Sequence, residues 1–155
     1  AYALLESEPD DPLRSTVVFR DIQNAYWSGL SPLRNADGIR ESIAELDRIE
    51  KEELPRMYVP QKSRQYNTDW HRALEARNML MCARATGEAA LLREECRGAH
   101  VREDFPIEDN ENFLKSTKVS YSNGEWSASL EELDGTLMSV EDMKPIMPKL
   151  DLFEQ

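Results

Sequence analysis

The sequence predicts a mainly α-helical fold: an antiparallel three-helix bundle with a long central third helix, followed by an irregular loop and a small C-terminal β-hairpin. Two amphipathic segments precede residue 54, an alanine-rich segment runs from Asn67 to about Arg97, and an Asn-Gly pair separates two alternating stretches. Apolar residues three and four apart indicate helices, whereas alternation around Asn-Gly indicates a hairpin. Helices with short connections pack as antiparallel neighbours.

The 155 residues suit a single domain, which we divide into four predicted parts. Residues 1–11 form a lead-in segment, and residues 12–98 form the three-helix bundle. Residues 99–135 form a loop and a hairpin that packs on the bundle. Residues 136–155, which contain Pro145 and Pro148, form an extended tail.

The first helix is predicted to begin at Pro12, which suits a first helical turn, with Asp11 as its cap. It ends near Gly29. Its apolar face comprises Val18, Ile22, Ala25 and Tyr26.

The second helix is predicted to begin after a capping residue, Asn35, and to end near Leu54-Pro55. Its apolar stripe comprises Ile39, Ile43, Leu46 and Ile49. The segment from Pro55 to Tyr66 contains two prolines and several basic residues, which indicates a loop.

The third helix is predicted to start at Asn67-Thr68-Asp69 and to end at Arg97, where Gly98 takes the left-handed conformation of a helix stop. Its many small residues would let neighbouring helices approach closely, so we expect it to be central. Cys82 and Cys96 both fall inside it, about 21 Å apart, which is too far for a disulfide. We therefore expect two reduced, buried thiols and a cytoplasmic-type compartment.

The hairpin is predicted from alternating apolar residues on either side of Asn123-Gly124, the pair preferred in a type I′ turn. A lone hairpin is marginally stable in water. We therefore expect the face that carries Tyr121 and Trp126 to pack on the bundle or on a partner.

The net charge of −11 argues against nucleic acid and anionic lipid as partners, because both require a basic surface. A basic protein partner stays possible, although solubility alone also explains the charge. No apolar run approaches the length of a membrane helix, and no signal peptide opens the chain. The start at Ala1 indicates a fragment or a processed product.

The search for chemistry gives mainly exclusions. The sequence has no dinucleotide fingerprint, phosphate loop or Cys-x-x-Cys pair, and its two histidines are too few for a multi-histidine metal site. Neighbouring glutamates such as Glu131 and Glu132 are interpreted as solvated surface, and His71 as an exposed or partly packed side chain. We therefore predict no catalytic, cofactor-binding or metal-binding residue in this chain.

One dense group of charges extends from Arg93 to Pro106 around the predicted end of the third helix. Arg97 suits a last helical turn, where cations complement the helix dipole. His100, Arg102 and Asp104 follow the helix and have no capping role in this prediction. They form either a charge network that locks the loop or one that receives another domain. We take Arg97, His100, Arg102 and Asp104 as candidate interdomain contacts.

This stretch resembles the C-terminal domain of the succinate dehydrogenase/fumarate reductase flavoprotein subunit family. That family has a helix ending in Arg-x-Glu-Ser-Arg-Gly-Ala-His, followed by Arg-x-Asp-Phe/Tyr-Pro, an acidic turn and a hairpin. The resemblance covers about residues 14–130 and is specific over 93–117. Cys96 stands where the family usually has Ser, and Asn110 where a second acidic residue is common. The matching residues are Arg93, Glu95, Cys96, Arg97, Gly98, Ala99, His100, Arg102, Asp104, Phe105 and Pro106.

The resemblance implies that the flavin and the dicarboxylate-binding residues lie in upstream domains, which become this chain's expected partners together with an iron–sulfur subunit. The parent would use FAD to move a hydride to or from a dicarboxylate. This chain by itself would be a non-catalytic helical domain. It would lie in the cytoplasm, or at the cytoplasmic or matrix face of a membrane through partner subunits.

Three alternatives stay open at this point. L-aspartate oxidase is similar but tends to carry Leu at the position of Ala99. The adenylylsulfate reductase flavoprotein has a similar bundle and a hairpin like Gly124-Glu125-Trp126, but it lacks the Arg-Gly-Ala-His run. The third alternative is a stand-alone three-helix adaptor that binds proteins through its bundle.

Overall fold

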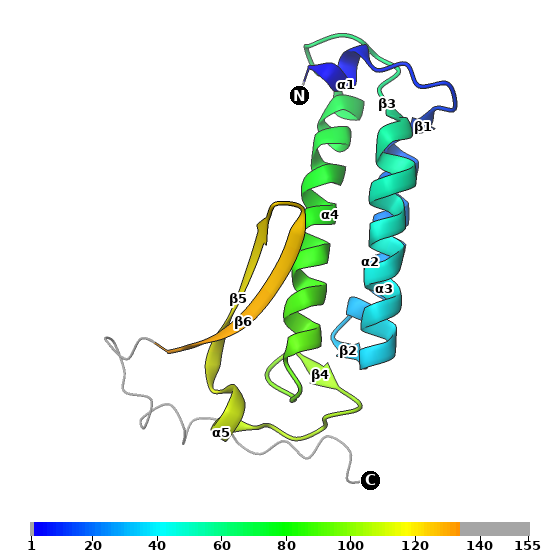
Figure 1. Cartoon of the computed structure of the whole chain (residues 1–155). Coiled ribbons are helices and arrows are strands. Elements are labelled where there is room, and N and C mark those ends of the chain that lie inside the picture. The colour runs from blue at the N-terminus through cyan, green and yellow to red at the C-terminus, as the bar shows by residue number, and fades with distance from the viewer. Residues whose placement is uncertain (1, 134–155) are drawn as a thin grey trace.

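The computed structural model describes residues 2–133, of which helices make up about half (Figure 1). The α-helices are α1 (Ala3–Glu6), α2 (Ser15–Leu30), α3 (Ala36–Arg48), α4 (Thr68–Leu92) and α5 (Asn110–Phe113). A π-helical turn (Ile49–Glu53) and a 3₁₀ turn (Leu54–Arg56) continue α3. The strands are β1 (Leu13–Arg14), β2 (Leu33–Arg34), β3 (Met57–Tyr58), β4 (Val101–Arg102), β5 (Lys115–Ser122) and β6 (Glu125–Glu132).

The three long helices α2, α3 and α4 lie side by side and successively reverse direction (Figure 1). On its other side, α4 contacts the β5–β6 hairpin. The prediction of a mainly helical fold with a C-terminal hairpin is confirmed. A plain three-helix bundle, however, omits α1, α5 and two pairs of short parallel strands. The buried core includes Val18, Ile22, Leu30, Ile39, Leu46, Ile49, Met57, Val59, Ala73, Ala76 and Leu80.

Two asparagine caps fix the starts of α3 and α4 as predicted. The Asn35 side chain accepts a hydrogen bond from the Gly38 amide at 2.9 Å, and Asn67 accepts one from the Trp70 amide at 2.9 Å. Each cap satisfies a backbone donor that the first helical turn leaves unpaired.

The predicted start of the first helix is wrong. Instead of a helix from Pro12, the chain forms strand β1, in which Leu13 pairs with Met57 in parallel, and α2 begins only at Ser15. The extended backbone of this pairing is incompatible with a helical turn at Pro12. The predicted lead-in segment is also structured, because Leu4 and Leu5 of α1 are buried in the core.

The predicted end of the third helix is wrong too. Helix α4 ends at Leu92, and the backbone of Arg93 is already extended. Gly98 does have a positive φ of 57°, but it lies in a tight turn well beyond the helix. Consequently Cys96 is buried outside the helix, and Cys82 on α4 is exposed, contrary to the prediction of two buried helical thiols.

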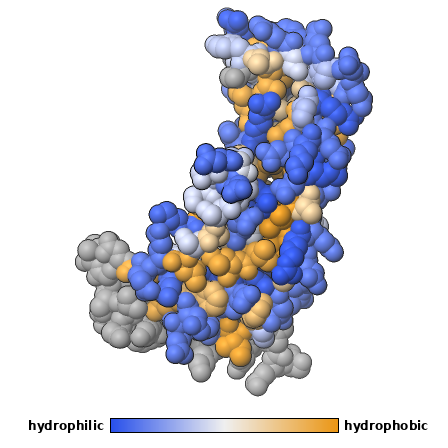
Figure 2. Space-filling model, viewed as in Figure 1, coloured by the Kyte–Doolittle hydropathy of each residue, from blue (hydrophilic) through white to orange (hydrophobic). Residues whose placement is uncertain are grey.

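The hairpin forms the predicted turn, since Asn123 and Gly124 have positive φ values of 54° and 86°. Tyr121 pairs with Trp126, and their ring centroids lie 4.7 Å apart. Residues on one face of the hairpin, including Val119 and Trp126, are half-buried, whereas Tyr121 stays exposed. Figure 2 shows apolar surface gathered where the hairpin lies against the helices.

The predicted tail at 136–155 lies outside the described residues. Within residues 2–133, none of the helices combines the length and the apolar character needed to cross a membrane.

Small residues bring α2 and α3 into close contact, at a pair of helices for which the sequence did not predict it. A Cβ atom added to Gly29 would lie 2.0 Å from the Gly38 carbonyl oxygen and 2.7 Å from the Ser42 hydroxyl. A Cβ added to Gly87 of α4 would lie 2.7 Å from the Ile43 side chain of α3. These contacts set how closely the helices pack.

We predict that Gly29→Ala lowers the free energy of unfolding by about 3 kcal/mol, because the new methyl group collides with backbone that cannot rotate away. Gly38→Ala is the matched control. Its Cβ would meet no atom closer than the Asn35 side-chain oxygen at 3.3 Å. We expect it to change stability by no more than about 1 kcal/mol. Urea unfolding of the whole chain measures both, and equal midpoints for the two variants would contradict the prediction.

Candidate functional site at the end of the long helix

The charged segment that follows α4 folds back on the helix end. Beyond Leu92 the chain turns at Gly98, where Arg97 and His100 exchange two backbone hydrogen bonds of 2.8 and 3.0 Å. It then returns as β4, which pairs in parallel with β2. This route brings all four sequence-predicted residues, Arg97, His100, Arg102 and Asp104, to one end of the molecule.

Glu95 lies at the centre of the first half of this cluster, with a fully buried carboxylate. Both Arg93 and Arg97 donate hydrogen bonds to it, the latter through two nitrogens at 2.8 Å each. The Asp109 amide adds a further bond of 2.9 Å. A carboxylate can be buried only when it is paired and hydrogen-bonded in this way.

The two arginines around Glu95 reach into different parts of the chain. Arg97 also donates to the Glu108 carboxylate and the Asn110 side-chain oxygen, each at 2.8 Å. These bonds to anionic partners raise the pKa of Arg97, chiefly through Glu95, so it stays charged. Arg93 instead donates to the carbonyl oxygens of Phe113 and Lys115, at 2.8 and 2.6 Å. It therefore fixes the start of the hairpin to the end of α4.

Arg102 occupies the second half of the cluster and is only 1% exposed. Its guanidinium donates to the carbonyl oxygens of Ala90, at 2.9 Å, and Arg93, at 3.1 Å. These belong to the group of carbonyls that a helix end leaves unpaired. Our expectation that Arg102 has no capping role is therefore wrong: it caps α4 from ten residues beyond the helix end.

Asp104 connects this cap to the start of another helix. Its two carboxylate oxygens accept a bidentate pair of bonds from Arg102, both 2.7 Å, and one of them also accepts the Ala36 amide at 2.9 Å. Ala36 is the first residue of α3, where the helix dipole favours an anion. The bonds from Arg102, followed by that from Ala36, lower the pKa of Asp104 to about 2.

His100 is held on both ring nitrogens. The Arg34 guanidinium lies 3.3 Å from Nδ1, and the Arg93 carbonyl oxygen lies 3.0 Å from Nε2. Because an arginine can only donate and a carbonyl can only accept, Nδ1 must be the acceptor and Nε2 the N–H donor. This is a neutral imidazole. Burial is the main cause that lowers the pKa of His100, and the nearby positive charge of Arg34 also contributes.

Cys96, which stands where the family usually has Ser, makes a local hydrogen bond through its sulfur. Its sulfur accepts the Arg102 amide at 3.1 Å and lies 3.4 Å from the Arg102 carbonyl oxygen. The buried thiol is thus part of the structure that positions β4. Nothing in this arrangement activates it as a nucleophile, since it is buried and already hydrogen-bonded.

Sequence reasoning left Glu95, Asn110 and Arg34 out of the candidate site. Glu95 carried one usable signal: an acid with an arginine two residues away on either side is a candidate pair in extended chain. The other two had no local signal, because Asn110 reaches Arg97 from the first residue of α5, 13 residues away, and Arg34 reaches His100 across 66 residues. Residues 2–133 contain no group of three or more His, Cys, Asp or Glu side chains arranged to hold a metal ion.

A separate groove lies between α2 and α4, and we call it the α2–α4 groove. It encloses about 440 Å³. Trp27 stands beside it with 72% of its surface exposed. The lining residues are Ile22, Gln23, Tyr26, Trp27, Met79, Cys82, Ala83 and Thr86.

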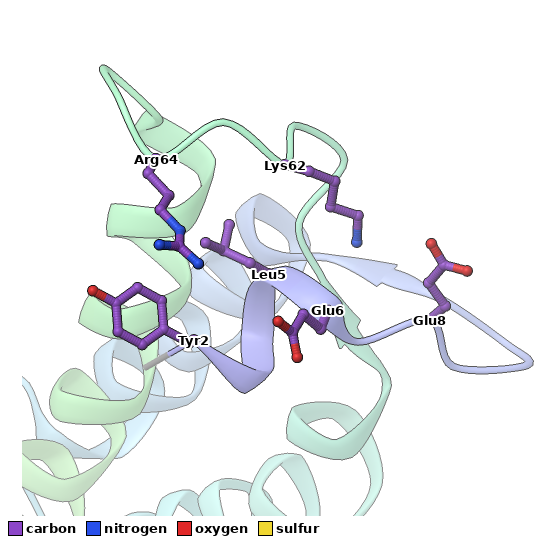
Figure 3. A pocket seen from close by; sticks show the side chains of 6 residues that line it. All are labelled: Tyr2, Leu5, Glu6, Glu8, Lys62 and Arg64. Atoms are coloured by element: carbon purple, nitrogen blue, oxygen red, sulfur yellow. The ribbon is translucent and has the colours of Figure 1, made fainter.

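A further pocket of about 350 Å³ lies beside α1, away from the charged cluster (Figure 3). The Arg64 guanidinium stands 4.8 Å from the centre of the Tyr2 ring, and Lys62 extends toward the side of Glu6 and Glu8. Two acidic and two basic residues therefore line the pocket. Their charges cancel and favour neither an anionic nor a cationic ligand.

Comparison with known proteins gives consistent matches. A family model described as fumarate reductase flavoprotein C-term matches residues 19–149. The chain is 35% identical over 117 residues to a fumarate reductase flavoprotein subunit of Mycobacterium tuberculosis, covering 76% of this chain and 18% of the relative. The chain therefore spans about a fifth of that relative's length.

Solved structures match the fold. An E. coli quinol fumarate reductase matches with a TM-score of 0.75 and 22% identity, covering 86% of this chain and 24% of that chain. An adenylylsulfate reductase of Archaeoglobus fulgidus matches with a TM-score of 0.72 and 17% identity, covering 82% and 20% respectively. At these identities the likeness establishes the fold alone.

We predict that Glu95→Gln lowers the free energy of unfolding by about 3 kcal/mol, because it leaves two arginines without their buried counter-ion. Glu94→Gln is the matched control, since Glu94 is exposed and forms no ion pair within residues 2–133. Denaturant unfolding measures both variants. A loss of less than about 0.5 kcal/mol for Glu95→Gln would show that the carboxylate does not hold the cluster together.

We also predict that the pKa of His100 lies below the usual histidine value of 6.5. A pKa lowered by folding contributes stability above the unfolded value, and this contribution is lost as the pH falls through the folded value. Stability should therefore decrease as the pH falls below about 6.5. Arg34→Gln removes a nearby positive charge and should raise the pKa of His100. NMR titration of the imidazole protons measures the pKa of His100 in the unmodified chain and in Arg34→Gln. A midpoint at or above 6.5 in the unmodified chain would contradict the prediction.

Proposed function

Because the chain belongs to the family of fumarate reductase flavoprotein C-terminal domains, we propose that it is the helical, non-catalytic domain of an oxidoreductase flavoprotein subunit and stabilises the position of that subunit's flavin-binding part. We interpret α2, α3 and α4 as one bundle that acts as a rigid support. The relative from Mycobacterium tuberculosis is named a flavoprotein subunit, and this chain matches about a fifth of it. The other four fifths of the relative are long enough to contain a flavin-binding region.

The observation that carries this proposal is the α2–α4 groove with Trp27 beside it. Large aromatic side chains that stay exposed next to an apolar groove are typical of contact surfaces. The rest of the parent subunit is the occupant that fits best, since it accounts for most of the length of the relative. In this proposal Trp27 and Met79 contact the flavin-binding part directly.

The cluster at the end of α4 contributes to this role in two ways. Arg102 is buried and acts indirectly, by holding the loop and two helix ends in one position. Arg97, His100 and Asp104 are not fully buried, so we propose that their accessible edges contact the neighbouring domain. The two readings left open by the sequence, an internal lock and an interdomain contact, are then compatible.

In the parent subunit we propose FAD as the cofactor and a hydride transfer involving a dicarboxylate as the reaction. An iron–sulfur subunit would accept or supply the electrons. The parent would lie in the cytoplasm, or at the cytoplasmic or matrix face of a membrane through its partner subunits. The isolated chain should give no yellow colour and no succinate-dependent dye reduction.

A related parent is the second candidate. The likeness to adenylylsulfate reductase and the Gly124-Glu125-Trp126 turn favour that family, whereas the run from Arg97 to His100 favours the first. L-aspartate oxidase is disfavoured by Ala99. A stand-alone adaptor would use the same α2–α4 groove for another protein. An upstream reading frame that encodes a glycine-rich, flavin-binding strand–turn–helix would eliminate the adaptor.

We predict that Trp27→Ser, introduced into the complete subunit that carries this chain, lowers flavin content and succinate-dependent dye reduction together. A central aromatic contact contributes about 2 kcal/mol or more, so docking should weaken by about 30-fold. Tyr66→Ser is the matched control, since Tyr66 is 98% exposed and lies outside the groove.

Trp27→Ser should leave the urea midpoint of this chain unchanged, because its side chain is already largely exposed. A loss of flavin without a loss of fold then identifies docking as the cause. If Trp27→Ser and Tyr66→Ser retain the same flavin content, the groove does not contact the flavin-binding part.

A further inference from the structure

A second groove lies on the loop between β4 and the hairpin, and we call it the loop groove. It encloses about 570 Å³. Its apolar lining consists of Phe105, Pro106 and Ile107, and Ile107 is 69% exposed. The complete lining is Glu94, Asp104, Phe105, Pro106, Ile107, Glu108, Asp109, Asn110 and Glu111.

Every charged side chain that lines the loop groove is acidic. The neighbouring arginines, Arg97 and Arg102, are bonded inward to carboxylates and carbonyl oxygens. Glu94 and Glu111 form no ion pair with any side chain in residues 2–133, so their negative charge is not compensated there. The groove therefore combines an apolar floor with uncompensated acids at its rim.

The loop groove is held rigidly from beneath. The Ile107 carbonyl oxygen accepts the Cys96 amide at 3.2 Å, and the Phe105 ring lies 4.9 Å from the Arg102 guanidinium. Asp109 caps α5 by accepting the Glu111 and Asn112 amides. A preformed surface loses little conformational entropy on binding.

We propose that the loop groove docks a basic segment of a partner polypeptide, with one large apolar side chain against Ile107 and lysines or arginines near Glu94 and Glu111. Burying Ile107 removes apolar surface from water, and basic residues on either side neutralise the rim. This site is separate from the α2–α4 groove, and its anchoring residues Ile107, Glu94 and Glu111 are not among those proposed to contact the flavin-binding part.

Other occupants fit the loop groove less well. Nucleic acid and anionic lipid would be repelled by the acidic rim. A second copy of this chain would bring like charges together, since its net charge is −11. A divalent cation would need several free carboxylates, whereas Asp104, Glu108 and Asp109 are already hydrogen-bonded within the chain.

In the test, the whole ¹⁵N-labelled chain is titrated with the synthetic peptide acetyl-Lys-Lys-Leu-Lys-Lys-amide, and NMR records the chemical-shift changes of the chain. We expect saturable shifts concentrated at Ile107 and at Glu94 and Glu111. The double variant Glu94→Gln/Glu111→Gln should weaken binding about tenfold, since each exposed ion pair contributes little alone. Ile107→Ser should weaken it by a similar factor.

Two matched controls should bind like the unmodified chain. Glu41→Gln/Glu75→Gln removes two exposed acids from α3 and α4, and Leu33→Ser removes an exposed apolar side chain from β2. A peptide with Ser in place of Leu should bind about tenfold more weakly than the parent peptide. These results together would support an apolar contact flanked by charge.

Several outcomes would overturn the proposal. Absence of shifts at the loop groove would show that the peptide does not bind there. Equal weakening by the groove variants and their controls would show that binding reflects general charge attraction. Self-association that Ile107→Ser abolishes would make a second copy the occupant. Shifts at Ile107 on removal of residues 134–155 would make the chain's own end the occupant. None of these bears on the α2–α4 groove, so the flavoprotein proposal is tested independently.

Discussion

The buried guanidinium of Arg102 joins three segments that are distant along the chain. It caps the carbonyl oxygens of Ala90 and Arg93 at the end of α4, and it holds the Asp104 carboxylate against the first amide of α3. A buried cation is tolerated only where all of its donors have partners, so its surroundings are strongly constrained. The positions of β4, of the α3 start and of the α4 end therefore depend on one side chain.

A second buried centre, Glu95, extends this constraint to the rest of the loop. Through Arg93 it is connected to the hairpin, and through Arg97 to Glu108 and Asn110. The carboxylate and the two guanidinium groups satisfy one another away from water, where charge-assisted hydrogen bonds are strong. The loop after α4 lacks regular structure over most of its length, yet its conformation is fixed by these bonds.

This arrangement agrees with the supporting role that we propose for the chain. The polar groups of the cluster are directed at one another and at backbone carbonyl groups, so their hydrogen bonds hold the chain segments together. We propose that other molecules contact two surfaces beside it. These are the α2–α4 groove, with its exposed Trp27, and the loop groove, with its exposed Ile107 and acidic rim. The rigid cluster keeps the second of these surfaces in a defined shape.

The sequence by itself determined the features that depend on a few neighbouring residues. Asn35 and Asn67 cap their helices within three residues, and Asn123-Gly124 defines its turn locally. The long-range features were decided only by the tertiary structure. The helical pattern runs on to Arg97, but α4 ends at Leu92, and Arg102, ten positions later, donates to the Ala90 carbonyl oxygen near that end. Pairing across distant segments leaves no periodic trace in the sequence, since it depends on where the folded chain returns.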